Sequence, residues 1–247
     1  KEEGDDVPII VHKNNLVRSF LIAGKGRKVI DADYESLEPH CFASVSGDEG
    51  LQDIFNNGWD FYSTIAIKTE KLDEQRDKYP NGVSPDKKAP NFLKKIDPSK
   101  RNQAKGYALG IAYGMEAYAL SKGLEISQKD AEVLVDGYLN GFPKLKEWRI
   151  NSREQVKQHG FIVNRVGRIR HLPKAKQIYS KYGEQILDWR FRKELSERYG
   201  TEAVTQLYRD YKNAMNNCLN YQLQSLAAAV VNRAAIQINR KLNELGI

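Results

Sequence analysis

Residues 97–114 read DPSKRNQAKGYALGIAYG, and this stretch decides the fold that the chain is expected to adopt. Asp97 is a good N-cap and Pro98 is pre-organised for the first helical position, so a helix is predicted to begin here. Arg101 and Lys105 stand one turn apart on one face of that helix, and an aromatic residue follows two turns later. A cationic helix face of this kind is typical of polyphosphate binding, although a solvated basic face has the same pattern.

A second stretch, DADYESLE at residues 31–38, follows an apolar pair at residues 29–30. The pattern predicts a short strand at residues 29–30, joined through a glycine-containing turn to a strand at residues 20–22. Asp33 then lies at a strand end, where a carboxylate commonly binds a divalent metal. A solvated strand end is the alternative for Asp33 taken alone. Together with the cationic helix, the strand-end carboxylate indicates a nucleotidyl-transfer site.

The composition favours a polyanionic partner. The chain has 247 residues, and its 39 Lys and Arg residues exceed its 32 Asp and Glu residues, which gives a formal net charge of +7. The two cysteines, Cys41 and Cys218, have no disulfide framework and no metal-ligand spacing. No apolar run reaches the roughly 18 to 20 residues of a membrane span. The expected location is therefore the cytoplasm, or the host cytoplasm for a viral protein, with no membrane partner.

Helices dominate the remaining pattern. The predicted elements are helices at about residues 48–57 and 60–71, a turn-rich loop at 79–90, helices that begin near 97, 127 and 201, and a hairpin at 161–172. Ser127 with Asp130 resembles a capping box. The last helix is amphipathic, and its sequence allows a break near Asn216. Residues 174–210 are helical in pattern, and no function is predicted for them.

These residues occur in the order of a known family. The chain resembles the palm and fingers of family A DNA polymerases, the class related to bacterial DNA polymerase I. The segment from Asp33 to Asp48 resembles motif A of that family, and the Arg-x3-Lys-x7-Tyr-Gly pattern from Arg101 to Gly114 resembles motif B. The resemblance covers roughly residues 16–247. The family's His-Asp-Glu motif, which carries a second metal-binding aspartate, is absent from the sequence.

The resemblance implies an α+β fold, a partial right-hand polymerase with a palm sheet and helical fingers, open where the final palm strands are missing. Residues 1–60 are then a palm portion with motif A, and residues 61–159 are the fingers with motif B. Residues 160–247 are a palm portion with the hairpin and the long C-terminal helix. The implied function is template-directed DNA synthesis, in which a dNTP gives its nucleotidyl group to the 3′-hydroxyl of a primer.

The same resemblance assigns the catalytic and metal-binding residues. Asp33 and the carbonyl oxygen of Tyr34 are expected to bind two Mg²⁺ ions, and Lys105 is expected to act as general acid for the leaving pyrophosphate. Because Asp33 alone does not replace two carboxylates, the chain by itself is expected to be inactive. It is expected to need a complementary polymerase segment that carries the absent motif.

Substrate-binding residues follow from the same resemblance. Glu38 is expected to block a ribose 2′-hydroxyl and thereby to select deoxynucleotides. The residues expected to contact the incoming dNTP are Glu38, Tyr62, Arg101, Lys105, Leu109 and Tyr113. The residues expected to contact primer–template DNA are Gly114, Arg168, Asn220 and Gln224, with the two amides at the minor groove.

The sequence departs from the family pattern at three positions and leaves two alternatives open. Leu109, Tyr62 and Asn216 stand where an aromatic residue, a His and an Arg are usual, which suggests a divergent, phage-encoded member. A fragment of a single-subunit RNA polymerase would share both motifs, but Glu38 disfavours it because those enzymes carry Gly there. A non-catalytic DNA-binding module would use the same cations and amides to hold DNA.

Overall fold

The computed structural model describes residues 22–246, and the chain divides into two units, residues 1–35 and residues 36–247. In the first unit, residues 22–35 contain one turn, in which the amide of Arg27 donates to the carbonyl of Gly24 at 2.9 Å, and no helix or strand. The strand predicted at residues 29–30 is therefore wrong. Val29 and Ile30 are 60% and 65% exposed, and an unpaired strand leaves its backbone groups without partners. Most of the strand predicted at residues 20–22 lies outside the described residues.

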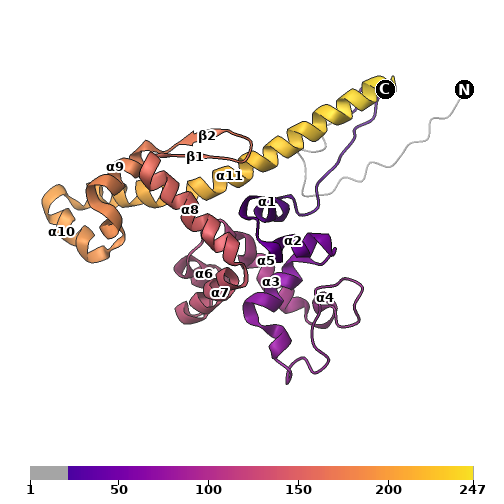
Figure 1. The fold of residues 1–247 in the computed structure, drawn as a ribbon, viewed down its shortest axis with the longest axis horizontal. Coiled ribbons are helices and arrows are strands. Elements are labelled where there is room, and N and C mark those ends of the chain that lie inside the picture. The colour runs from indigo at the N-terminus through magenta and orange to yellow at the C-terminus, as the bar shows by residue number, and fades with distance from the viewer. Residues whose placement is uncertain (1–21, 247) are drawn as a thin grey trace, which may run out of the picture. The chain divides into compact units, whose positions relative to one another are not determined.

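The second unit is mostly helical (Figure 1). Its helices and strands are α1 (Leu37–Ser46), α2 (Glu49–Asn56), α3 (Phe61–Glu70), η2 (Leu72–Glu74), α4 (Leu93–Ile96), α5 (Pro98–Ala112), α6 (Ala117–Leu124), α7 (Gln128–Gly141), α8 (Pro143–His159), β1 (Phe161–Val163), β2 (Ile169–His171), α9 (Pro173–Tyr182), η3 (Gly183–Leu187), α10 (Trp189–Tyr199) and α11 (Thr201–Glu244). The turn-rich loop predicted at residues 79–90 is confirmed between η2 and α4.

Local capping signals set the helix starts as predicted. The Asp97 carboxylate accepts a hydrogen bond from the amide of Lys100 at 3.1 Å, and Pro98 is the first residue of α5. The Ser127 hydroxyl accepts from the amide of Asp130 at 3.1 Å at the start of α7. A side-chain cap offsets the orphan amides of a first helical turn and stabilises each helix by about 1 kcal/mol.

The hairpin is also confirmed. Strands β1 and β2 are antiparallel, with Ile162 opposite Arg170 at the centre of the register. The side chain of Asn164 closes the turn, because its Oδ1 accepts from the amides of Val166 and Arg168 at 3.1 and 2.8 Å. Its Nδ2 donates to the Ser225 hydroxyl of α11 at 2.7 Å. These two strands form the only sheet within residues 22–246, so the wider palm sheet expected from the sequence is not seen in that part of the chain.

Two apolar clusters form the core, and α11 contributes to both. The first contains buried side chains of α1 to α3, α5 and α7, with Tyr107 and Tyr138 among the largest. The second joins α8, β1, α9 and η3 to the first half of α11. Residues 174–210, which had no predicted role, supply Ile178 and Ile186 to this second cluster. Full burial of such side chains contributes roughly 1.5–3 kcal/mol each.

Helix α11 continues without interruption through the position where a break was allowed near Asn216. Figure 1 shows α8, α9 and the hairpin gathered along its first half. Cys41 and Cys218 are buried and free, as expected. Within residues 22–246, none of the helices combines the length and the apolar character that a membrane crossing requires.

Candidate functional site

Arg101 projects from α5 to the start of α3, where it binds Asp60 through two hydrogen bonds. Its Nε donates to Asp60 Oδ1 at 2.8 Å, and its Nη2 donates to Oδ2 at 2.9 Å. Only 17% and 12% of the two side chains are exposed. Burial alone would raise the pKa of the Asp60 carboxyl, but hydrogen bonds from Arg101 and Ser63 hold that pKa below its usual range. Asp60 is therefore ionised at neutral pH and compensates the Arg101 charge.

Tyr62 lies beside this ion pair. The Arg101 guanidinium carbon is 5.4 Å from the centre of the Tyr62 ring, within the range of a cation–π contact. Burial raises the pKa of the Tyr62 hydroxyl, so it keeps its proton and can donate a hydrogen bond at neutral pH. The structure therefore brings together two residues that the sequence assigned to nucleotide binding.

Lys105 differs from Arg101 in its surroundings. It lies one turn further along α5 and is exposed. Among residues 22–246 its ammonium group forms no hydrogen bond or ion pair. An exposed ammonium without a protein partner is free to bind an anion without first breaking an internal contact.

The end of α5 meets α1 through Tyr113. The Tyr113 hydroxyl donates to the Glu38 carboxylate, although the two residues are 75 positions apart. Burial, and next the hydrogen bond to Glu38, raise the pKa of Tyr113. The Phe42 ring contacts the Tyr113 ring edge-on, with centroids 5.1 Å apart, while Leu109 is partly buried against the first cluster. The polar end of Tyr113 is thus held at one carboxylate.

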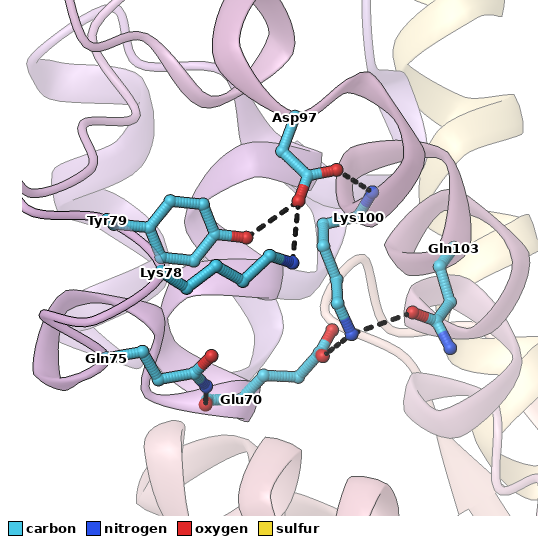
Figure 2. A network of polar contacts seen from close by, with 7 residues as sticks. All are labelled: Glu70, Gln75, Lys78, Tyr79, Asp97, Lys100 and Gln103. Carbon is cyan, nitrogen blue, oxygen red and sulfur yellow. Dashed lines mark hydrogen bonds and ion pairs between the residues drawn. The ribbon is translucent and has the colours of Figure 1, made fainter.

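A network of polar contacts anchors the loop before α5 (Figure 2). Asp97 Oδ2 accepts from Lys78 Nζ at 2.9 Å and from the Tyr79 hydroxyl at 2.7 Å. Burial would raise the pKa of Asp97, but these donors and the Lys100 amide lower it to about 2. Lys100 Nζ donates to Glu70 of α3 and to Gln103. These contacts fix the start of the helix that carries Arg101 and Lys105.

The four residues predicted to contact DNA differ in backbone conformation and in burial. Gly114 has a φ of +103°, and a Cβ there would meet Arg153 Nη2 at 3.0 Å and Asn216 Oδ1 at 3.1 Å. Arg168 and Gln224 are exposed. Asn220 has a buried Oδ1 without a hydrogen-bond partner. A buried amide oxygen of this kind is costly unless something donates to it.

The predicted metal ligands fall in the first unit. Asp33 and Tyr34 are exposed, Tyr34 at 46%. No group of three or more His, Cys, Asp or Glu side chains able to hold a metal ion occurs within residues 22–246. One carboxylate and one backbone carbonyl supply only part of the ligands that two divalent ions need.

Two acidic residues at helix starts have roles that the sequence analysis missed. Asp60 pairs with Arg101, and Asp48 is only 2% exposed and accepts from the amides of Leu51 and Lys144 at 3.1 and 3.0 Å. Both are N-caps, which the sequence signals. Their distant partners are not signalled, because they lie 41 and 96 positions away.

The chain matches the family model of DNA polymerase family A over residues 5–81 and 86–247. Together with the ordered motifs, this match shows that the chain belongs to DNA polymerase family A.

Relatives that match this chain include DNA polymerase I proteins. The thermostable DNA polymerase I of Thermus filiformis is 29% identical over 168 residues, which are 68% of this chain and 18% of that protein. DNA polymerase I of Mycobacterium tuberculosis is 27% identical over 240 residues, which are 97% of this chain and 21% of that protein. The chain thus spans about a fifth of the length of these relatives.

The fold is similar to the POL domain of Pol1 from M. smegmatis, solved in complex with DNA primer-template and dNTP. The TM-score is 0.64 at 24% identity, and the likeness covers 98% of this chain and 35% of that chain. At this identity the likeness supports the α+β polymerase-like fold rather than any single residue's role.

Proposed function

We propose that this chain takes part in template-directed DNA synthesis, in which a dNTP transfers its nucleotidyl group to a primer 3′-hydroxyl. The observation that carries the proposal is the polar face of α5. Arg101 is held by Asp60, Lys105 is exposed and unpaired among residues 22–246, and Tyr113 is hydrogen-bonded to Glu38. This face offers cations for a triphosphate and, two turns away, a carboxylate for sugar selection.

The two cations have different parts to play. Lys105 binds the triphosphate directly and gives a proton to the leaving pyrophosphate oxygen, because its ammonium is free of internal partners. Arg101 uses Nε and Nη2 on Asp60, which leaves Nη1 for a phosphate oxygen. Asp60 therefore positions the Arg101 guanidinium. Tyr62 adds one neutral donor beside it.

Glu38 is the proposed sugar-selecting residue. Its carboxylate is held by the Tyr113 hydroxyl, and in the proposed site it blocks a ribose 2′-hydroxyl by its bulk. Leu109 and Tyr113 border the place of the incoming base in this proposal. Selection of deoxynucleotides then depends on the contact between Glu38 and Tyr113.

Metal binding is proposed only in part. Asp33 and the Tyr34 carbonyl are proposed as ligands of Mg²⁺, and a second carboxylate is proposed to be supplied with the His-Asp-Glu motif of the family. A complementary polymerase segment is the proposed source. The chain on its own is then inactive.

DNA contacts complete the proposal. Gly114, Arg168, Asn220 and Gln224 are proposed to contact primer–template DNA, and the unpartnered Oδ1 of Asn220 supports a ligand at that position. Residues 1–60, 61–159 and 160–247 are proposed to be a palm portion, the fingers and a second palm portion, with the palm open toward the complementary segment.

A non-catalytic DNA-binding module is the second candidate. It is favoured by the exposure of Lys105 and Arg168, because exposed cations bind a DNA backbone without any metal centre. In that case the same cations and amides hold DNA without chemistry.

Primer extension separates the two functions. The chain is assayed with Mg²⁺ and dNTPs, alone and mixed with a polypeptide that carries the His-Asp-Glu segment, and duplex DNA binding is measured in parallel. Synthesis only in the mixture, lost in Asp33→Ala with DNA binding retained, supports the proposal. DNA binding without synthesis in a mixture that forms a stable complex supports the binding module. Incorporation of rNTPs instead of dNTPs would support an RNA polymerase fragment.

A further inference from the structure

A small cavity lies between α8, η3 and α11, with the N-cap of α6 at its edge. Its volume is about 260 Å³, below the range of drug-sized pockets and sufficient for a small anion with ordered water. The charged and hydroxyl groups that line it are Glu116, Arg153, Lys157, Glu184, Tyr211 and Lys212. The sequence analysis assigned none of these residues.

The cations of the cavity differ in their partners. Lys157 is paired with both Glu184 and Glu154, and Lys212 donates to Glu116 at 3.0 Å. Arg153 has no carboxylate partner among residues 22–246, because its Nε and Nη2 donate to the Met215 carbonyl at 3.3 Å and the Asn216 Oδ1 at 3.2 Å. Its Nη1 group remains available, so Arg153 is the cavity cation whose charge is not directly bonded to a carboxylate.

A second cation lies close to Arg153. Arg149 lies one turn before Arg153 on α8 and is only 7% exposed. Its Nε and Nη1 are buried without a hydrogen-bond partner. Burial, and next the charge of Arg153, lower the pKa of Arg149 to about 10, which leaves it protonated at neutral pH. Glu116 acts on Arg149 through its charge but forms no hydrogen bond with these two nitrogens. Buried cations are normally paired through hydrogen bonds, so two neighbouring guanidinium groups with free donors favour an external anion.

A buried donor without a partner also borders the cavity. Tyr211 is 1% exposed and lines the cavity, and its hydroxyl has no hydrogen-bond partner. Burial raises the pKa of that hydroxyl, so it retains its proton. A guanidinium and a phenol hydroxyl are both suitable donors to phosphate oxygens.

We propose that this cavity is a binding site for a phosphate group, held by Arg153 and the Tyr211 hydroxyl in the positive field of Arg149. A backbone phosphate of nucleic acid and free inorganic phosphate offer the same chemistry. Arg153 contacts Asn216, one turn before Asn220 on α11, and lies against Gly114. The site therefore adjoins two proposed DNA contacts and is separate from Arg101 and Lys105.

The site is tested by thermal unfolding of the full chain. The Tm in inorganic phosphate is compared with the Tm in chloride at equal ionic strength. The Tm of the wild type is expected to rise by about 2–4 °C when the phosphate concentration is about five times the dissociation constant. Tyr211→Phe and Arg153→Gln are expected to lose that gain. Tyr107→Phe, at an equally buried tyrosine outside the cavity, is expected to keep it. Each variant is compared with itself, so a change in its basal stability does not affect the result.

Duplex DNA identifies the source of the phosphate. If it is a DNA backbone phosphate, Arg153→Gln reduces the slope of log K against log salt by about 1, while Arg190→Gln, at an exposed residue of α10, leaves it unchanged. This arm rests on the proposed function. If the wild type does not bind duplex DNA, the result counts against that function. The thermal-unfolding experiment with inorganic phosphate then tests the cavity by itself. Equal responses of the wild type and Tyr211→Phe to phosphate, with an unchanged slope in Arg153→Gln, would overturn the proposal.

Discussion

The hydroxyl of Tyr113, at the end of α5, donates a hydrogen bond to the carboxylate of Glu38 in α1, 75 positions earlier in the chain. This hydrogen bond connects a residue of motif A to a residue of motif B. It also means that the orientation of the Glu38 carboxylate depends on a residue of another helix.

Removal of this hydroxyl is the first prediction. Tyr113→Phe leaves the Glu38 carboxylate without its donor, so the free energy of unfolding should fall by about 1–2 kcal/mol. In a completed polymerase the ratio of dNTP to rNTP incorporation should fall as well. Urea denaturation and competitive incorporation measure the two effects. Tyr118→Phe, at a residue that is 68% exposed, is the control and should change neither.

The ion pair of Asp60 and Arg101 gives the second prediction. Asp60→Asn removes the partner of a mostly buried guanidinium and weakens the cap of α3, so unfolding free energy should fall by about 2–3 kcal/mol. Asp53→Asn, at an exposed residue of α2, should stay within about 0.5 kcal/mol of the wild type. Equal losses in the two variants would show that the pair does not stabilise the fold.

Lys105 provides a test of nucleotide binding without a folding effect. Because the residue is exposed, Lys105→Ala should leave the denaturation midpoint unchanged and weaken dNTP binding at least about tenfold, through loss of a charge-assisted hydrogen bond. Calorimetric titration with a dNTP measures the change. Lys129→Ala, at an exposed residue of α7, is the matched control. Unaltered dNTP affinity in Lys105→Ala would remove Lys105 from the site.

Acid stability should depend on Asp97. Its pKa in the folded protein, about 2, is below the ordinary value of 3.8 for an aspartate, so its ionised form stabilises the fold. That contribution is fully present above about pH 4 and is lost as the pH falls toward 2. Asp97→Asn should therefore lower stability at neutral pH and flatten its decline between pH 4 and 2. Asp136→Asn, exposed on α7, should retain the wild-type profile.

A pair of glycines tests the packing around Gly114, one of the proposed DNA contacts. Gly114→Ala introduces a Cβ at a φ of +103°, 3.0 Å from Arg153 Nη2, and should cost about 1–3 kcal/mol. Gly123→Ala places a Cβ in open space in α6 and should raise stability by about 0.5–1 kcal/mol. Thermal unfolding should move in opposite directions for the two variants.

The family, the helix starts and the hairpin could be predicted from the sequence. Asp97-Pro98 and Ser127 act on amides within their own first turn, so their effect is local and visible in the chain. The hairpin at residues 161–171 also depends on local contacts, since Asn164 accepts hydrogen bonds from the amides of its own turn. The strand predicted at residues 29–30 failed because a strand depends on hydrogen bonds from a partner.

By itself the sequence determined which residues carry charge, cap helices and spell the motifs, because these properties depend on near neighbours in the chain. Only the tertiary structure decided that Arg101 is compensated by Asp60 while Lys105 stays exposed, and that Arg149 is buried without a carboxylate. The physical reason is that charge compensation and desolvation depend on side chains brought together from distant positions, and no spacing along the chain encodes that meeting.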